Sequence, residues 1–141
     1  MVDFGDCGVR VGTDVQSIDE VAASIETFGA HYLQRLFTDH EVHHSGGSTA
    51  AAAPGLAARF AAKEAAMKVL RPTDEIPTWR SIEVRSQAGG WTELELSDVA
   101  GELAVLQGLS RFSVSLSHGA GVAMATVVAI CVPVNSGNPT D

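Results

Sequence analysis

Basic residues are scarce in this sequence. Nine lysines and arginines stand against 17 aspartates and glutamates in 141 residues, which gives a formal net charge of −8. The few cations do not form the stripe that follows a nucleic-acid backbone or an anionic membrane surface. We therefore expect neither nucleic acid nor membrane as a partner, and any anionic ligand must be bound by a few locally placed cations.

Cysteines and long apolar runs are also few. Cys7 and Cys131 do not have the spacing of a metal-binding pair and could form one disulfide at most. No segment approaches the roughly 18 apolar residues of a membrane helix. The first residues lack the basic and apolar regions of a signal peptide. Together these absences predict a reduced, cytoplasmic setting.

The spacing of apolar residues predicts the strands and helices. Alternation with a period of two predicts strands over residues 8–15 and 111–118, and residues 121–130 are apolar on both faces, as in a central strand. Two further alternating stretches, WRSIEV and WTELEL, flank Gly89-Gly90 and predict a hairpin. Helical spacing marks four more stretches, which are residues 17–29, 30–37, 56–70 and 99–109. Ser17 or Asp19 could cap the first of these, and the T-x-x-E spacing of Thr38 and Glu41 predicts a capping box for another short helix.

One α+β domain accounts for this pattern. A chain of this length, 45% hydrophobic, can bury one core but not two. We predict one domain over residues 1–131, in which a small, mainly antiparallel sheet packs against helices. Residues 43–55 are low in complexity and are expected to form a mobile surface loop. Residues 132–141 have no periodicity and are expected to be disordered.

The helix around RFAAKEAAMK, residues 59–68, poses the main question. Its large apolar residues fall on one stripe, and Lys63 falls in the middle of that stripe. Lys63 either extends its amine past buried methylenes to water or faces a cleft where it binds an anion. Glu64 and Lys68 are spaced as a helical ion pair, which as a surface pair is worth only a few tenths of a kcal/mol.

Other candidate residues lie near the ends of predicted elements. Asp14 is the last polar residue of the first strand, where acids usually begin turns or cap helices. His118 follows an apolar strand, where a hydrogen-bonded structural histidine is the ordinary interpretation. Two acids from separate elements, backed by cations, would suit Mg²⁺ that holds a phosphate, because Mg²⁺ takes only one or two carboxylates. His43 and His44 have no third ligand at useful spacing and are expected to be solvated.

Five motifs occur together in one order: VGTDV, RLFTDHE, RFAAKEAAMK, the strand after Trp79 and SVSLSH. This ordered set resembles the holo-[acyl-carrier-protein] synthases, the short single-domain branch of the 4′-phosphopantetheinyl transferases. The resemblance extends from Gly8 to Ile130. It implies an enzyme that transfers the 4′-phosphopantetheine arm of coenzyme A to a serine of an apo acyl or peptidyl carrier protein. The resemblance also implies that adenosine 3′,5′-bisphosphate is released, that Mg²⁺ is required, and that the chain assembles as a homotrimer with coenzyme A between neighbouring subunits.

The resemblance also implies roles for individual residues. Asp14 and Glu64 are expected to bind Mg²⁺. Lys63 and Lys68 are expected to lie near the phosphates of coenzyme A and to act in catalysis with Glu64. Arg59 and His118 are expected to contact the nucleotide end of coenzyme A, including its 3′-phosphate. Either Glu64 or a metal-bound water would deprotonate the attacking serine.

Two departures from the family pattern bear on partners. Residues 15–29 contain three acids and no basic residue, whereas relatives often carry basic residues there that meet the acidic carrier protein. We therefore predict a less acidic carrier or docking through Arg35. Gly89-Gly90-Trp91 replaces a frequent G-x-P pattern. The carrier could belong to fatty-acid, polyketide or peptide synthesis. Two other functions stay open: the chain could be a catalytically silent relative that binds coenzyme A or carrier proteins, or an unrelated interaction domain.

Overall fold

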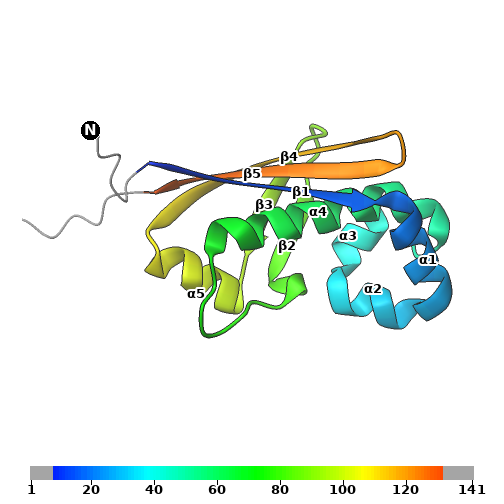
Figure 1. Cartoon of the computed structure of the whole chain (residues 1–141), viewed down its shortest axis with the longest axis horizontal. Helices are drawn as coiled ribbons and strands as arrows, with labels where there is room; N and C mark the ends of the chain where they lie inside the picture. Colours follow the sequence, from blue (N-terminus) through cyan, green and yellow to red (C-terminus); the bar gives the residue numbers. More distant parts are fainter. Residues whose placement is uncertain (1–7, 132–141) are drawn as a thin grey trace, which may run out of the picture.

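A three-stranded antiparallel sheet forms one layer of the computed structural model, which describes residues 8–131 (Figure 1). Its strands are β1 (Val9–Ser17), β4 (Leu109–Gly119) and β5 (Val122–Cys131), in the order β1-β5-β4. The long apolar strand is therefore central, as predicted. Val9 pairs with Ile130 at one end of β1 and Ser17 pairs with Val122 at the other. Cys131 is buried at the end of β5, whereas Cys7 and the tail 132–141 lie outside the described residues.

A separate hairpin contains β2 (Ile82–Ser86) and β3 (Thr92–Leu96), which pair in antiparallel register. Gly90 in its turn has φ of +92°, a conformation that glycine adopts without a Cβ clash. The hairpin predicted around the two glycines is confirmed. The predicted α+β class with small antiparallel sheets is confirmed as well.

The long helix α4 (Ala53–Leu70) lies between the sheet and the hairpin (Figure 1). Its two faces are buried at once, because Ala61 and Ala62 pack with Val84 of β2 on one side and Ala125 of β5 on the other. Seven alanines of α4 are buried, at positions 53, 57, 58, 61, 62, 65 and 66. Such small side chains allow the helix to approach both neighbours closely.

Three short helices gather at one end of α4: α1 (Ile18–Phe28), α2 (Ala30–Leu36) and α3 (Asp39–His44). Ser17 rather than Asp19 caps α1, by accepting a hydrogen bond from the Glu20 N–H. Thr38 and Glu41 form the capping box of α3 that their spacing predicts. At the other end lies α5 (Asp98–Leu106), which stops before its predicted end because Leu109 already begins β4.

The expected loop over residues 43–55 differs most from the structure. His43 and His44 belong to α3, Ala50–Ala52 forms a 3₁₀ helix, and α4 begins at Ala53. Ala52 and Ala53 are buried, because methyl groups that look featureless in the sequence fit against the core. Only residues 45–49 lie outside helices. Within the described chain, no helix has the length and apolar character needed to cross a membrane.

Candidate active site

Gly12 determines how closely β1 approaches α4. A Cβ atom built at Gly12 would lie only 2.2 Å from the Ala65 carbonyl oxygen and 3.2 Å from Val69 Cγ2. Any other residue would therefore push the strand away from the helix. The close contact brings the polar face of β1 against the part of α4 that carries Glu64 and Lys68.

Asp14 lies two residues beyond Gly12 on the same face of β1. Its Oδ2 accepts a hydrogen bond from Gln16 Nε2 at 2.7 Å, and its Oδ1 lies 3.4 Å from Lys68 Nζ. Lys68 also donates to the Thr13 carbonyl at 2.7 Å. The lysine is more than half exposed, so its amine can exchange the Thr13 carbonyl for another acceptor at low cost.

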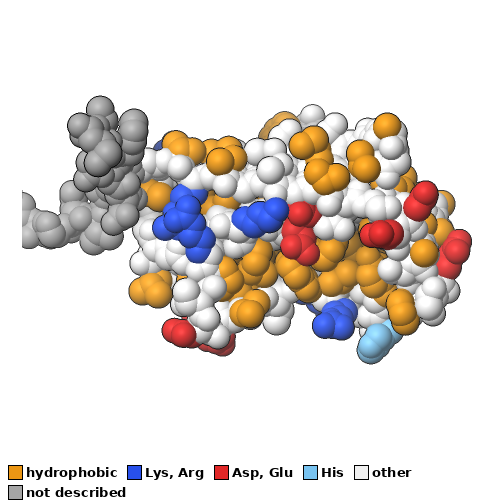
Figure 2. Space-filling model, in the orientation of Figure 1, with side chains coloured by type: hydrophobic (Ala, Val, Ile, Leu, Met, Phe, Trp, Pro, Cys, Tyr) orange, Lys and Arg blue, Asp and Glu red, His pale blue; other side chains and the backbone are white. Residues whose placement is uncertain are grey.

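Glu64 belongs to the same cluster. Burial raises the pKa of Glu64, the negative charge of Asp14 raises it further, and Lys68 opposes both effects. The two carboxylates are thus close enough to repel each other. Figure 2 shows acidic and basic side chains side by side over α4 on this face.

Two carboxylates from neighbouring elements, near enough for the charge of one to raise the pKa of the other, suit a cation. Asp14 and Glu64 provide the hard oxygen ligands that Mg²⁺ prefers, and Mg²⁺ needs no more than two such ligands when phosphate oxygens and waters complete its shell. No cluster of three or more candidate metal ligands occurs among residues 8–131, which does not count against a two-carboxylate site. The oxygen ligands of Asp14 and Glu64 are therefore of the kind that Mg²⁺ takes, and the Mg²⁺ site stays a prediction.

Lys63 does not belong to this cluster, and the expectation that it lies near phosphates is contradicted. Its side chain is completely buried and forms an ion pair with Glu41, with Nζ 2.8 Å from Oε1. The amine also donates to the carbonyls of Trp79 at 2.9 Å and Ile82 at 2.6 Å. An ammonium has three donors, and all three are used inside the protein. The alternative that Lys63 extends to water is wrong as well.

Arg59 lies one turn before Lys63, on the same face of α4. Its guanidinium donates to the Gly55 carbonyl at 3.1 Å and to Ser86 Oγ at 3.1 Å, while its buried Nε has no partner. Burial lowers the pKa of Arg59, and the charge of Glu41 opposes this shift. The structure does not join Arg59 to Asp14 or Lys68 by any contact among the described residues.

His118 is exposed near the end of β4. It pairs with Ala123 of β5, whereas Asp14 pairs with Ala125 of β5 from the opposite edge. Because neighbouring strands lie about 4.8 Å apart, His118 and Asp14 are separated by roughly 10 Å across the sheet. One chain therefore presents its predicted site residues as two groups, Asp14 with Glu64 and Lys68, and separately Arg59 and His118.

Two important residues were not identified as such from the sequence. Glu41 was recognised only as a capping residue, and nothing local indicates that it pairs with Lys63. Gly12 was assigned only a place on the polar face of a strand. A glycine within a predicted strand is itself a signal of close backbone approach.

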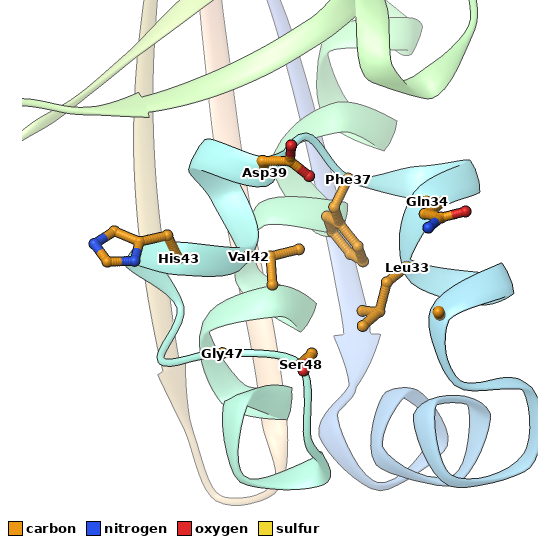
Figure 3. Close-up of a pocket in the computed structure, with 9 residues that line it drawn as sticks. Leu33, Gln34, Phe37, Asp39, Val42, His43, Gly47 and Ser48 are labelled. Carbon is orange, nitrogen blue, oxygen red and sulfur yellow. The ribbon is translucent and has the colours of Figure 1, made fainter.

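An apolar hollow of about 430 Å³ lies elsewhere, between α2, α3 and residues 46–48 (Figure 3). Leu33, Phe37 and Val42 point toward one another there, with Asp39 and Gln34 among the polar lining residues. None of the predicted site residues lines it.

Comparison with known proteins shows the family of this chain. The sequence pattern of the 4′-phosphopantetheinyl transferase superfamily matches residues 10–127. This chain belongs to that superfamily. It is 38% identical over 121 residues to a holo-[acyl-carrier-protein] synthase of Streptomyces coelicolor, and the match covers 86% of this chain and 96% of the relative. It is 41% identical over 123 residues to a Myxococcus xanthus protein of the same name, with 86% and 94% covered.

Solved structures of this family have the same fold. The Helicobacter pylori holo-[acyl-carrier-protein] synthase in complex with coenzyme A has a TM-score of 0.73 and 25% identity, and the match covers 85% of this chain and 99% of that one. The Mycobacterium tuberculosis acyl carrier protein synthase has a TM-score of 0.70 and 29% identity, with 89% and 99% covered. The resemblance found in the sequence motifs is therefore confirmed.

Proposed function

We propose that this phosphopantetheinyl transferase moves the 4′-phosphopantetheine arm of coenzyme A to a serine of an apo acyl carrier protein, with Mg²⁺, and releases adenosine 3′,5′-bisphosphate. The observation that carries the proposal is the cluster of Asp14, Glu64 and Lys68, held together by the glycine contact between β1 and α4. The Helicobacter pylori relative, solved with coenzyme A, supports the choice of donor substrate.

Phosphoryl transfer needs positioned positive charge more than covalent help from the protein. Asp14 and Glu64 would hold Mg²⁺, which neutralises charge on the pyrophosphate of coenzyme A when bound. Asp14 Oδ2 is already occupied by Gln16, so Oδ1, which now faces Lys68, is the oxygen available to a cation. Lys68 would then turn its amine from Asp14 to a phosphate oxygen. Glu64 would take the serine proton, unless a water held at the cation site takes it instead.

A homotrimer would bring the two groups of site residues together. The valines of β1 point away from α4: Val9, Val11 and Val15 are 68%, 66% and 56% exposed. Val122, Met124 and Ile130 extend this apolar face along β5, and Figure 2 shows hydrophobic side chains along the sheet edge of the molecule. Apolar surface of this extent is typical of an interface. We infer that a neighbouring subunit covers it, and that Arg59 and His118 of one subunit meet coenzyme A bound at Asp14 of the next.

The docking of the carrier protein differs from that expected of basic relatives. Asp19, Glu20 and Glu26 are all exposed on α1, and the exposed Arg35 of α2 is the nearby cation in the sequence. We propose that the carrier is less acidic than usual or docks through Arg35. Added salt should then weaken carrier binding only slightly, and a steep loss of affinity with salt would contradict this proposal.

A transfer assay tests the function. The protein is incubated with coenzyme A, Mg²⁺ and a panel of apo carrier proteins, and mass spectrometry detects the added phosphopantetheine arm. We expect Asp14→Ala and Glu64→Ala to lose transfer, and the matched control Asp74→Ala, on an exposed loop, to keep it. Coenzyme A binding without transfer would instead indicate a silent relative. Unchanged turnover in both site variants would remove the metal assignment, and light scattering tests the trimer separately.

A further inference from the structure

The ion pair of Glu41 and Lys63 is unusual because both side chains are 0% exposed. Lys63 is bonded to three elements at once: Glu41 of α3, the Trp79 carbonyl in the 3₁₀ helix Trp79–Ser81, and the Ile82 carbonyl at the start of β2. The amine therefore links one face of α4 to α3, to the 3₁₀ helix and to β2.

The carboxylate of Glu41 is equally well bonded. Its Oε1 accepts from the Thr38 N–H at 2.8 Å, and its Oε2 accepts from the Val84 N–H of β2 at 2.8 Å. A buried ion pair of this kind rarely adds net stability, because desolvation offsets the attraction between the charges. Its best-attested use is to select one arrangement among several that pack about equally well.

Helix α4 requires such a selection. Its buried surface consists largely of alanines, and methyl groups of equal size on several sides of a helix give it little preference for one rotation. The candidate site tolerates little rotation, because catalytic groups must hold their directions within roughly 10–20°. Glu64 follows Lys63 directly and points about 100° away from it around the helix.

We propose that the Glu41–Lys63 pair is a positioning device that sets the rotation of α4, so that Glu64 and Lys68 face Asp14. The pair holds one side of the helix, and the close contact of Gly12 with the Ala65 carbonyl holds the opposite side. Neither Glu41 nor Lys63 touches substrate; both act through Glu64. The proposal rests on the proposed function, because it treats Asp14 and Glu64 as the cation site.

The test compares two variants that each alter a buried part of α4 or its partners. Glu41→Gln with Lys63→Met removes both charges together, so that no buried charge is left unpaired. Leu70→Ala is the control, since Leu70 is fully buried on the same helix and its truncation leaves a cavity without touching the pair. Circular dichroism establishes that each protein is folded at the assay temperature. Electron paramagnetic resonance then measures free Mn²⁺ during titration in the presence of coenzyme A, as a direct measure of cation binding.

We expect the double variant to bind Mn²⁺ at least about tenfold more weakly than the wild type, as is usual when groups that orient metal ligands are removed. The kcat of the double variant should fall together with its Mn²⁺ affinity. The Leu70→Ala variant should keep the Mn²⁺ affinity of the wild type. A folded double variant with wild-type Mn²⁺ affinity would overturn the proposal. If the double variant does not fold, Glu41→Gln alone is judged by the same criterion. Failure of the proposed function gives a different result from failure of the positioning proposal. In that case the wild type would bind no Mn²⁺, or the Asp14→Ala variant would bind Mn²⁺ as tightly as the wild type.

Discussion

Replacing Gly12 with alanine tests whether the contact between β1 and α4 builds the site. The added Cβ would lie 2.2 Å from the Ala65 carbonyl oxygen, whereas ordinary contacts begin near 3.4 Å. The obstacle is helix backbone, which cannot turn aside as a flexible side chain would. Relief therefore requires the strand and helix to separate by roughly 1 Å.

Both stability and activity should respond to this separation. Overpacking of a core costs about 1–3 kcal/mol, and a backbone obstacle places Gly12→Ala at the upper end of that range. The lower entropy of the unfolded alanine chain offsets about 0.4–1 kcal/mol. The net loss is then about 2 kcal/mol. A displacement of roughly 1 Å between Asp14 and Glu64 should also reduce transfer by about 10²-fold.

Guanidinium denaturation and the mass-spectrometric transfer assay measure the two effects. Gly8→Ala is the matched control, because Gly8 immediately precedes β1 and a Cβ there meets nothing within 4 Å. The control should stay within about 0.5 kcal/mol of wild type and keep full activity. If Gly12→Ala also kept wild-type stability and turnover, the close approach of β1 to α4 would have no bearing on the site.

Four further substitutions have definite expected outcomes. In denaturation experiments Lys63→Met should lose about 3–5 kcal/mol, since Glu41 is left charged and buried, whereas Lys68→Met should lose less than about 1 kcal/mol yet abolish transfer. Glu64→Gln should raise the melting temperature of the metal-free protein at neutral pH. Burial raises the pKa of Glu64 in the folded protein, so the folded state loses stability as pH rises from the ordinary pKa of a glutamate through this raised pKa. Glutamine has no charge and removes that loss. His40 accepts a backbone N–H through Nε2, and burial lowers its pKa. The stability of the wild type should therefore decline as pH falls below about 6.5. Between pH 7 and pH 5.5, the melting temperature of the His40→Gln variant should fall less than that of the wild type. Equal falls in the two proteins would exclude His40 as the cause.

Signals carried by neighbouring residues were sufficient for much of the fold. The capping box of Thr38 and Glu41, the glycine turn of the hairpin and the alternation of β4 each depend on residues within a few positions of one another. Their physical causes are local hydrogen bonds and turn geometry, which act the same way in most folds. Asp14, Glu64 and Lys68 were found through motifs, and the structure brings them together.

Alternation alone did not reveal which face of β1 is covered. Val9 and Val11 are apolar and would ordinarily face the core, yet they are exposed, and the face with Gly12 and Asp14 meets α4 instead. A period of two defines two faces without saying which is inside. The helix stripe was similarly misleading: Phe60 and Met67 are only partly buried, because a helix covered on both sides uses its alanines for the closest contacts.

Lys63 and Glu64 illustrate the limit of a motif. The family resemblance placed Lys63 near the phosphates of coenzyme A and Glu64 at the Mg²⁺ that would bind them. On a helix, however, consecutive side chains point about 100° apart and cannot readily serve one small ligand. Helix geometry thus favours different partners for the two charges. In the structure the charge of Asp14 acts on Glu64, whereas Lys63 forms its ion pair with Glu41. The lysine in the apolar stripe is therefore explained by a carboxylate buried with it, on the side of α4 opposite the contact with Gly12.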